Sequence, residues 1–271
     1  ADTVQQSGDL LAQCLAAARQ HGVEVHVWVL WGTLDGAPDA WRERLRRQGR
    51  LQVSSAGQTV EWLCPSHPDK LRLFSEMLRE LLRTYPVDGL HLDYIRYPSP
   101  DFDYSRGALQ RFRSWVAYGL GADRLAELDR AALRDPLAFT TALPAEWDEF
   151  RRAQITSLVE EIYRAVKASR PDIVVSAAVV AEPETAYNIR FQDWERWLAQ
   201  EILDVAVPMA YTPDDARFRE LVRSARRAAG ERGRVWAGIG AYLDTAAGTL
   251  SKVDLARAED AGGVVLFSYD W

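Results

Sequence analysis

The stretch Val87–Pro98, VDGLHLDYIRYP, combines a short apolar strand with ionisable side chains near its end. Side chains alternate between the two faces of an extended strand, so we expect His91, Asp93 and Ile95 on one face. Burying a histidine and a carboxylate on an otherwise apolar strand costs desolvation energy, which is typical of a functional site. The alternative is a purely structural Asp93, paired with Arg96 or His91.

Five further segments have the same short, almost continuously apolar character, and most of the connections between them contain a helical pattern. The predicted strands are 23–31, 87–98, 172–180, 203–211, 234–242 and 263–270. The predicted helices are 8–20, 68–84, 148–169, 192–201, 214–229 and 249–260. Residues 32–66 are interpreted as a loop region in which 42–50 forms a solvated basic helix face. This alternation is typical of a parallel sheet covered on both faces.

Two architectures fit such a pattern, an open doubly wound sheet and a (β/α)8 barrel. No glycine-rich nucleotide-binding fingerprint follows any of the strands. The chemically distinctive residues lie at strand C-termini, where barrel enzymes place their active sites. We therefore predict an α/β fold of the (β/α)8, TIM-barrel type, forming a single catalytic domain over 1–271. Only six strands are evident, so the first two are expected upstream of this sequence, unless the barrel is incomplete.

Residues 101–147 form an insertion directly after the strand that carries Asp93, and they contain short helical pieces and many charges. A long excursion at the C-terminal end of a barrel strand is expected to border the mouth of the site. It would then wall a groove or act as a lid. The alternative is a stabilising addition on the outside of the barrel.

Charge and composition argue against several classes of protein. The chain has 271 residues, with 33 Lys and Arg against 39 Asp and Glu, and no basic tract that would favour nucleic acid or an anionic membrane as partner. No apolar run reaches the roughly 18 residues that span a bilayer. Cys14 and Cys64 make neither a disulfide framework nor a CxxC spacing, and His26 and His67 are isolated. We therefore predict no metal and no cofactor, and a metal-dependent hydrolase is the least favoured function.

The segment VDGLHLDYIRYP resembles the hallmark of the glycosyl-hydrolase-like family ten, bacterial barrel proteins linked to the cleavage of cell-wall or exported glycans. Further resemblances follow in the family's order: GVEVHVWVLW (22–31), HPDKLRLFSEMLRELLRTYPVDG (67–89), QDWERWL (192–198), DVAVPMAYT (204–212) and GGVVLFSYDW (262–271). The resemblance covers most of residues 8–271. Family members have two further strands upstream, and these two together with the six evident here would complete a barrel of eight.

This resemblance implies a glycoside hydrolase acting on a bacterial polysaccharide, such as peptidoglycan glycan strands or another amino-sugar polymer. It also implies export to the periplasm or the cell exterior, with a cytoplasmic location as the alternative. A more distant similarity to family 18 chitinases places Asp93 at the last Asp of their fourth-strand motif. Ile95 then occupies the position of the chitinases' catalytic Glu, so their substrate-assisted mechanism does not carry over.

Glycoside cleavage usually uses two carboxylates, one as proton donor and one as base or nucleophile. Asp93 is the first candidate, and Glu182 or Asp270 is the second, because each lies at the end of a predicted strand. Ten Trp and ten Tyr provide aromatic rings of the kind that stack on sugars. The predicted substrate-binding residues are His91, Arg96, Tyr97, Trp31, Met209, Tyr211 and Trp271. The alternative function is a non-catalytic glycan-binding protein on a degenerate barrel.

Overall fold

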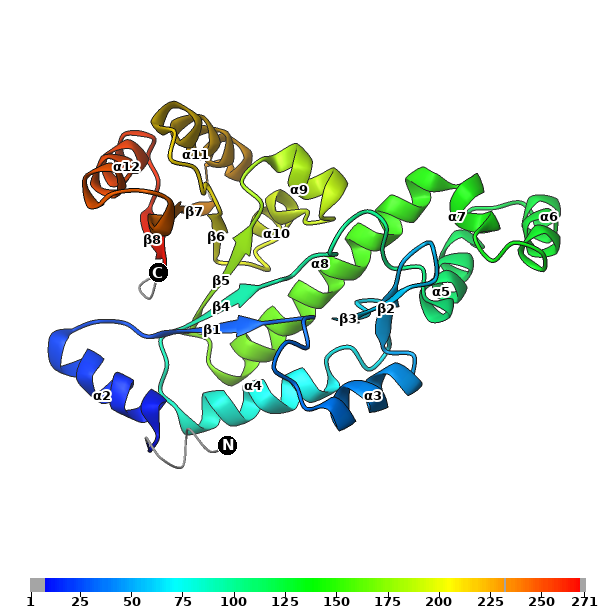
Figure 1. Cartoon of the computed structure of the whole chain (residues 1–271), viewed down its shortest axis with the longest axis horizontal. Helices are drawn as coiled ribbons and strands as arrows, with labels where there is room; N and C mark the ends of the chain where they lie inside the picture. The colour runs from blue at the N-terminus through cyan, green and yellow to red at the C-terminus, as the bar shows by residue number, and fades with distance from the viewer. Residues whose placement is uncertain (1–7, 232, 269–271) are drawn as a thin grey trace.

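The computed structural model describes residues 8–231 and 233–268, and its centre is a six-stranded, curved parallel sheet (Figure 1). The strand order is β1-β4-β5-β6-β7-β8, so each strand pairs with the next one along the chain. The strands are β1 (His26–Leu30), β4 (Gly89–Asp93), β5 (Val174–Val179), β6 (Val205–Pro208), β7 (Arg234–Gly240) and β8 (Gly263–Phe267). The predicted strands and the parallel α/β architecture are confirmed.

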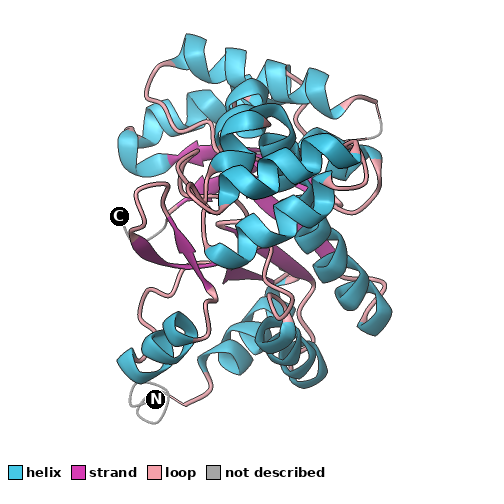
Figure 2. Ribbon diagram, turned by 90° about the vertical axis from the view of Figure 1, so that its right-hand side faces the viewer, coloured by secondary structure: helices cyan, strands magenta, loops and turns pink. Residues whose placement is uncertain are grey.

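Helices lie above and below the strands, which occupy the middle of the molecule (Figure 2). The predicted helices correspond to α2 (Leu10–His21), α4 (Arg72–Thr84), α8 (Pro144–Ser169), α10 (Trp194–Ala199), α11 (Asp215–Ala229) and α12 (Ala246–Ala258). The short helix α9 (Pro183–Ile189) was not predicted. Among the described helices, none combines the length and the apolar character needed to cross a membrane.

The sheet is curled into a half-barrel, with β1 and β8 as its outer strands. The curvature brings the first strand near the last two on the concave side. The ring centroids of His26 and Trp236 lie 5.9 Å apart, and those of Trp28 and Phe267 lie 6.1 Å apart. The convex side of the central strands is the main core, where Trp197 is fully buried and donates to the Thr156 hydroxyl at 3.0 Å.

Residues 32–66 contain more regular structure than predicted. They form α3 (Asp39–Arg47) and an antiparallel hairpin of β2 (Leu51–Val53) and β3 (Thr59–Leu63). The helix is not purely a solvated face, because Leu45 on it is buried. A residue outside the hairpin holds it in place, because the Asp103 carboxylate accepts a hydrogen bond from the Val53 N–H at 2.9 Å. Local patterning over so short a pair of strands is weak, so the sequence alone does not predict the hairpin.

The segment 101–147 forms α5 (Arg106–Val116), α6 (Ala122–Ala132) and α7 (Ala138–Ala142), and it runs into the first turn of α8. These helices lie at one end of the molecule, far from β7 and β8 (Figure 1). They pack around a core of their own that includes Phe112 and Trp147. The assignment of one barrel domain with this segment as an insertion stays a prediction.

Candidate functional site

A cavity of about 570 Å³ occupies the concave side of the sheet. It is lined by alternate residues of the six strands, as expected for the inward face of a barrel wall. These residues are His26 and Trp28 of β1, His91 and Asp93 of β4, Ser176 and Ala178 of β5, Val207 of β6, Trp236 of β7, and Val265 and Phe267 of β8. Residues just after the strands complete the wall: Tyr94, Arg96, Met209 and Tyr211.

Two histidines line the cavity: His26 is the first residue of β1, and His91 is in the middle of β4. His26 occupies the space above Gly89, where an added Cβ would come within 2.1 Å of the imidazole Nδ1. The Nδ1 atom of His91 is 2.9 Å from the Ser176 hydroxyl. Burial lowers the pKa of His91 below its ordinary value of 6.5, so this imidazole is neutral at neutral pH.

Asp93 lies at the C-terminal end of β4, where it is 9% exposed and faces the cavity. The Trp28 indole donates to Oδ2 at 3.3 Å, and the Tyr94 backbone N–H donates to Oδ1 at 2.6 Å. The Arg96 guanidinium is 3.5 Å from Oδ1. The carboxylate is therefore held in one orientation by two N–H donors and one nearby cation, without being closed off from the cavity.

The chain turns sharply directly after Asp93, because Tyr94 adopts a left-handed backbone with φ of 59°. This turn ends the strand alternation, so the prediction that Ile95 shares the Asp93 face is wrong. Ile95 is fully buried in the core, and Tyr94 lines the cavity instead. The Arg96 guanidinium lies over the Tyr94 ring, 4.6 Å from its centroid.

Tyr211 and Phe267 line the cavity together with Asp93, and Tyr242 packs against both rings; these three residues are called the aromatic wall. The rings of Tyr211 and Phe267 are stacked with centroids 5.7 Å apart. Tyr242, in the short 3-10 helix η1 (Ala241–Leu243), meets both rings edge-on at 6.3 and 6.1 Å. Burial, followed by the negative charge of Asp93, raises the pKa of Tyr211 to about 12. Aromatic faces beside a carboxylate are suited to binding a sugar ring near an ionisable group.

The structure brings part of the predicted site together. His91, Asp93, Arg96, Met209 and Tyr211 all line the cavity. Most of the other lining residues are small, aliphatic or polar, but four Trp, Tyr and Phe residues among them are not predicted as site residues: Trp28, Tyr94, Trp236 and Phe267. For Trp28 the signal was present in the sequence, because it shares a strand face with His26.

Other predicted site residues lie elsewhere. Tyr97 is 1% exposed and packs edge-on against Phe191, and Trp31 is buried in the main core. Glu182 is the N-cap residue of α9 and forms an ion pair with Arg217 of α11. Asp270 and Trp271 lie outside the described residues.

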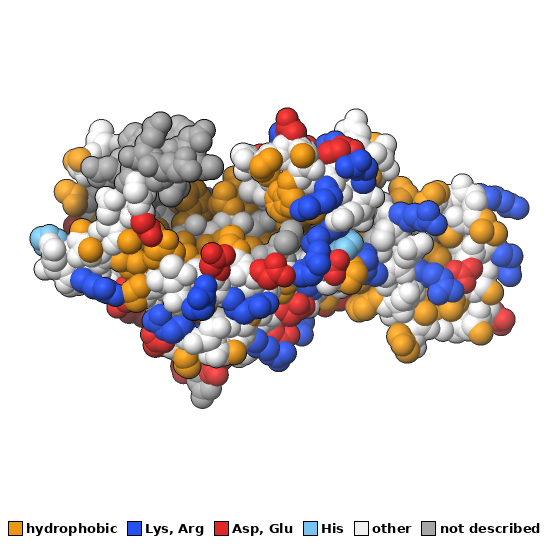
Figure 3. Space-filling view, turned by 90° about the horizontal axis from the view of Figure 1, so that it is seen from below, with side chains coloured by type: hydrophobic (Ala, Val, Ile, Leu, Met, Phe, Trp, Pro, Cys, Tyr) orange, Lys and Arg blue, Asp and Glu red, His pale blue; other side chains and the backbone are white. Residues whose placement is uncertain are grey.

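A second hollow, with a larger volume of about 900 Å³, runs along the free side of β1. Its walls are mainly apolar and include Leu30, Phe74 and Met77. Figure 3 shows a face of the molecule where hydrophobic side chains gather in a hollow beside lysine and arginine side chains. The smaller cavity is the candidate site, because it contains Asp93 together with ionisable and aromatic partners.

A parallel sheet curled into a half-barrel, with helices on its outside, belongs to the class of α/β folds of the TIM-barrel type. The glycoside hydrolase domain of PgaB (BpsB) from Bordetella bronchiseptica has a similar structure, with a TM-score of 0.67 and 19% identity over 93% of this chain and 72% of that one. A β-galactosidase from Bacillus circulans sp. alkalophilus has a TM-score of 0.66 and 15% identity over 96% of this chain and 42% of that one.

The chain belongs to the glycosyl hydrolase-like 10 family, whose sequence profile matches residues 2–242. The resemblance carried by Val87–Pro98 is thereby confirmed. An S-layer-related protein from Niallia circulans is 26% identical over 229 residues. That match covers 76% of this chain but only 14% of the S-layer-related protein.

The charge of Asp93 and the ionisation of Tyr211 are expected to be coupled. Substituting Asp93→Asn should lower the pKa of Tyr211 from about 12, because an anion beside a phenol opposes formation of the phenolate. The pKa should stay above 10.0, since burial is the larger cause. The measurement is an ultraviolet difference titration against Tyr211→Phe in each background. Asp254→Asn, on an exposed part of α12, is the control. An unchanged titration in Asp93→Asn would disprove the coupling.

Proposed function

We propose that this chain is a glycoside hydrolase that cleaves a bacterial polysaccharide by carboxylate acid/base chemistry. The proposal is carried by one observation, the placement of Asp93 at a strand end, facing a 570 Å³ cavity with aromatic walls. A glycosidase needs a carboxyl group beside the scissile oxygen or the anomeric carbon, and aromatic faces that hold the sugar. Membership of a hydrolase-like family supports the same function.

Seven of the cavity residues have a role in this proposal. Asp93 acts as proton donor or as nucleophile, and the N–H groups of Trp28 and Tyr94 orient its two oxygens. Tyr211 contacts the reacting sugar with its ring and hydroxyl. Arg96 binds a carboxylate or acyl substituent of the sugar, since its guanidinium lines the cavity. His91 and Met209 contribute to the sugar-binding wall.

The second carboxylate is proposed to be Asp270 or Glu182. Asp270 follows shortly after Phe267, which lines the cavity. Glu182 would have to leave its ion pair with Arg217 to reach a substrate. Asp270 is therefore the favoured partner, with Trp271 as an additional stacking surface.

We propose an amino-sugar polymer of the bacterial envelope as substrate, with peptidoglycan glycan strands as one form of it. The similarity to a protein named S-layer-related supports a place at the cell surface, and hence export of this chain.

The decisive experiment incubates the chain with a panel of bacterial polysaccharides that includes de-peptided peptidoglycan strands. Hydrolysis adds one water to each broken glycosidic bond and creates a new reducing end. We expect new reducing ends and shorter oligosaccharides by mass spectrometry for at least one polymer. Bound glycan without any released ends, over the whole panel and over acidic to neutral pH, would contradict the proposal.

That contrary result would support the second candidate function, a non-catalytic glycan-binding protein. One observation favours it. Among the described residues that line the cavity, the carboxylate other than Asp93 is Glu24, which lies near the amino end of β1 and contacts His26 at 3.3 Å. A cavity with one carboxylate at its mouth is suited to binding sugars but lacks the usual pair for cleavage.

A further inference from the structure

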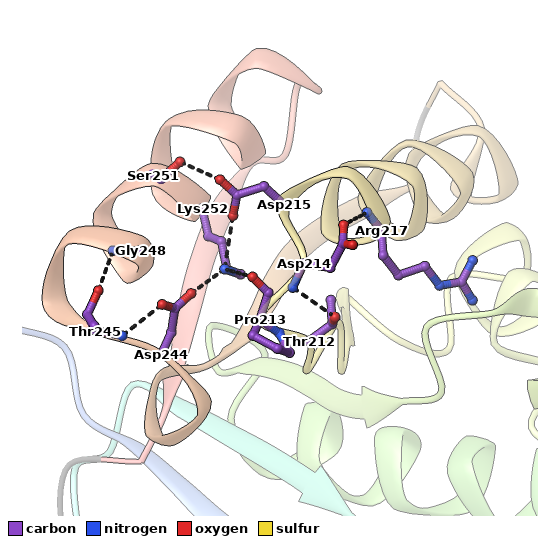
Figure 4. Close-up of polar contacts among 10 residues, drawn as sticks. All are labelled: Thr212, Pro213, Asp214, Asp215, Arg217, Asp244, Thr245, Gly248, Ser251 and Lys252. Atoms are coloured by element: carbon purple, nitrogen blue, oxygen red, sulfur yellow. Dashed lines mark hydrogen bonds and ion pairs between the residues drawn. The ribbon is translucent and has the colours of Figure 1, made fainter.

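Lys252 is a charged side chain in an unusual position. It lies on α12, is 1% exposed, and its ammonium group has three partners on two loops (Figure 4). Nζ is 3.0 Å from Asp215 Oδ1 and 3.2 Å from the Pro213 carbonyl oxygen, and it forms a second ion pair with Asp244. All three donors of the ammonium are thereby satisfied, which is the condition for burying such a charge.

The partners of Lys252 belong to the loops that follow β6 and β7. Asp215 is the first residue of α11 and also accepts from the Ser251 hydroxyl at 2.9 Å. Asp244 follows η1 and accepts from the Thr245 N–H at 2.7 Å, next to the cap of α12. One side chain therefore joins the C-terminal ends of two neighbouring strands.

The same two loops carry two rings of the aromatic wall. Tyr211 lies two residues before Pro213, and Tyr242 lies two residues before Asp244. Their rings meet edge-on at 6.3 Å, and both contact Phe267. Any relative movement of the loops would change the distance of this wall from Asp93.

The lysine of this cluster is buried, whereas the side chains of Asp244 and Asp215 are 16% and 50% exposed. Removing a charge from water offsets much of the gain from pairing it, and the best-supported use of such an ion pair is to fix one arrangement of the chain. The cluster persists over a wide pH range. Lys252 lowers the pKa of Asp215 and of Asp244 below 3.8, so their contribution is complete above that pH and is lost as the pH falls further. Burial alone would lower the pKa of Lys252, but the two carboxylates raise it above 10.5, so its contribution is lost only in strong alkali.

We propose that Lys252 is a positioning residue that holds Tyr242 against Tyr211, and Tyr211 in the wall of the cavity that contains Asp93, and so sets the affinity of the site for sugar rings. The affinity part rests on the proposed function. The positioning part rests on the contacts of Lys252 alone.

The test compares Lys252→Met with Lys167→Met in the full chain. Lys167 is a matched control, because it also pairs with an aspartate, Asp204 at 2.9 Å, but at the amino ends of the strands. Amide hydrogen exchange is expected to rise in 211–217 and 241–248 for Lys252→Met only. With the polysaccharide that the wild-type chain cleaves, KM should rise about tenfold and kcat should change less than about twofold, because sugar-ring contacts are lost and Asp93 is not.

The outcomes separate the two parts of the proposal. Equal exchange in 211–217 and 241–248 for both variants would overturn the positioning role. A faster exchange there with unchanged KM would overturn the link to affinity. A wild-type chain that neither binds nor cleaves any glycan would contradict the proposed function and the effect on affinity. The amide hydrogen exchange rates would still test whether Lys252 positions the two loops. If Lys252→Met does not fold, Asp244→Asn makes the same comparison while keeping the Lys252–Asp215 pair.

Discussion

Replacing Asp93 by Asn is expected to reduce glycan cleavage by about 10²–10⁴-fold, the usual contribution of a positioned acid or base. The amide keeps the size of the carboxylate and an oxygen that can accept from Trp28 or Tyr94, but it can neither donate a carboxylic proton nor act as a nucleophile. Initial rates of reducing-end release, from the polymer cleaved most rapidly by the wild-type chain, measure the loss.

The fold of this variant should be intact, since the isosteric amide leaves the β4 strand end in place. Circular dichroism and the unfolding midpoint check this point. Asp123→Asn, in the first turn of α6 and outside the cavity, is the matched control and should cleave at the wild-type rate. Wild-type activity in Asp93→Asn would refute the assignment of Asp93 and leave Asp270 and Glu182 as the residues to examine.

Substituting Gln192→Leu is expected to lower the free energy of unfolding by about 2–4 kcal/mol, because it leaves buried backbone groups without partners. The Gln192 side chain is fully buried just behind the site. Its amide accepts from the Val180 N–H at 3.0 Å and donates to the Ile95 carbonyl at 3.0 Å. Gln192 therefore connects the segment that follows β4 with the segment that follows β5. Urea unfolding monitored by tryptophan fluorescence measures the change.

Cleavage should fall as well in Gln192→Leu, since the turn that it supports contains Tyr94 and Arg96. Gln110→Leu, at an exposed position of α5, makes the same chemical change without a buried partner and should alter stability by less than about 0.5 kcal/mol. A small effect at 192, comparable with that at 110, would show that water or another side chain replaces the amide.

The fold could be predicted from the sequence because its strands are both short and apolar. Strands such as 172–180 and 203–211 are buried on both faces, and helices separate them, which leaves few topologies other than a parallel sheet. The hairpin at 51–63 could not be predicted in the same way. Its position depends on Asp103, some fifty residues away in the chain, and no local pattern records such a contact.

The site could be predicted only up to the point where strand geometry ends. Alternation along β4 correctly places His91 and Asp93 toward the cavity, and it fails one residue later. Arg96 and Tyr97 are adjacent in sequence, yet the first lines the cavity and the second is in the core. After a turn, the direction of each side chain depends on backbone angles that the amino-acid type does not determine.

The left-handed conformation of Tyr94 affects which substitutions position 94 can accept. A residue with a side chain pays about 1–2 kcal/mol to adopt this conformation, and glycine does not. Glycine at 94 would relax the backbone, but it would remove the ring that contacts both Trp62 and the Arg96 guanidinium. A change to glycine at this one position would therefore relieve the backbone and at the same time remove a ring from the cavity wall.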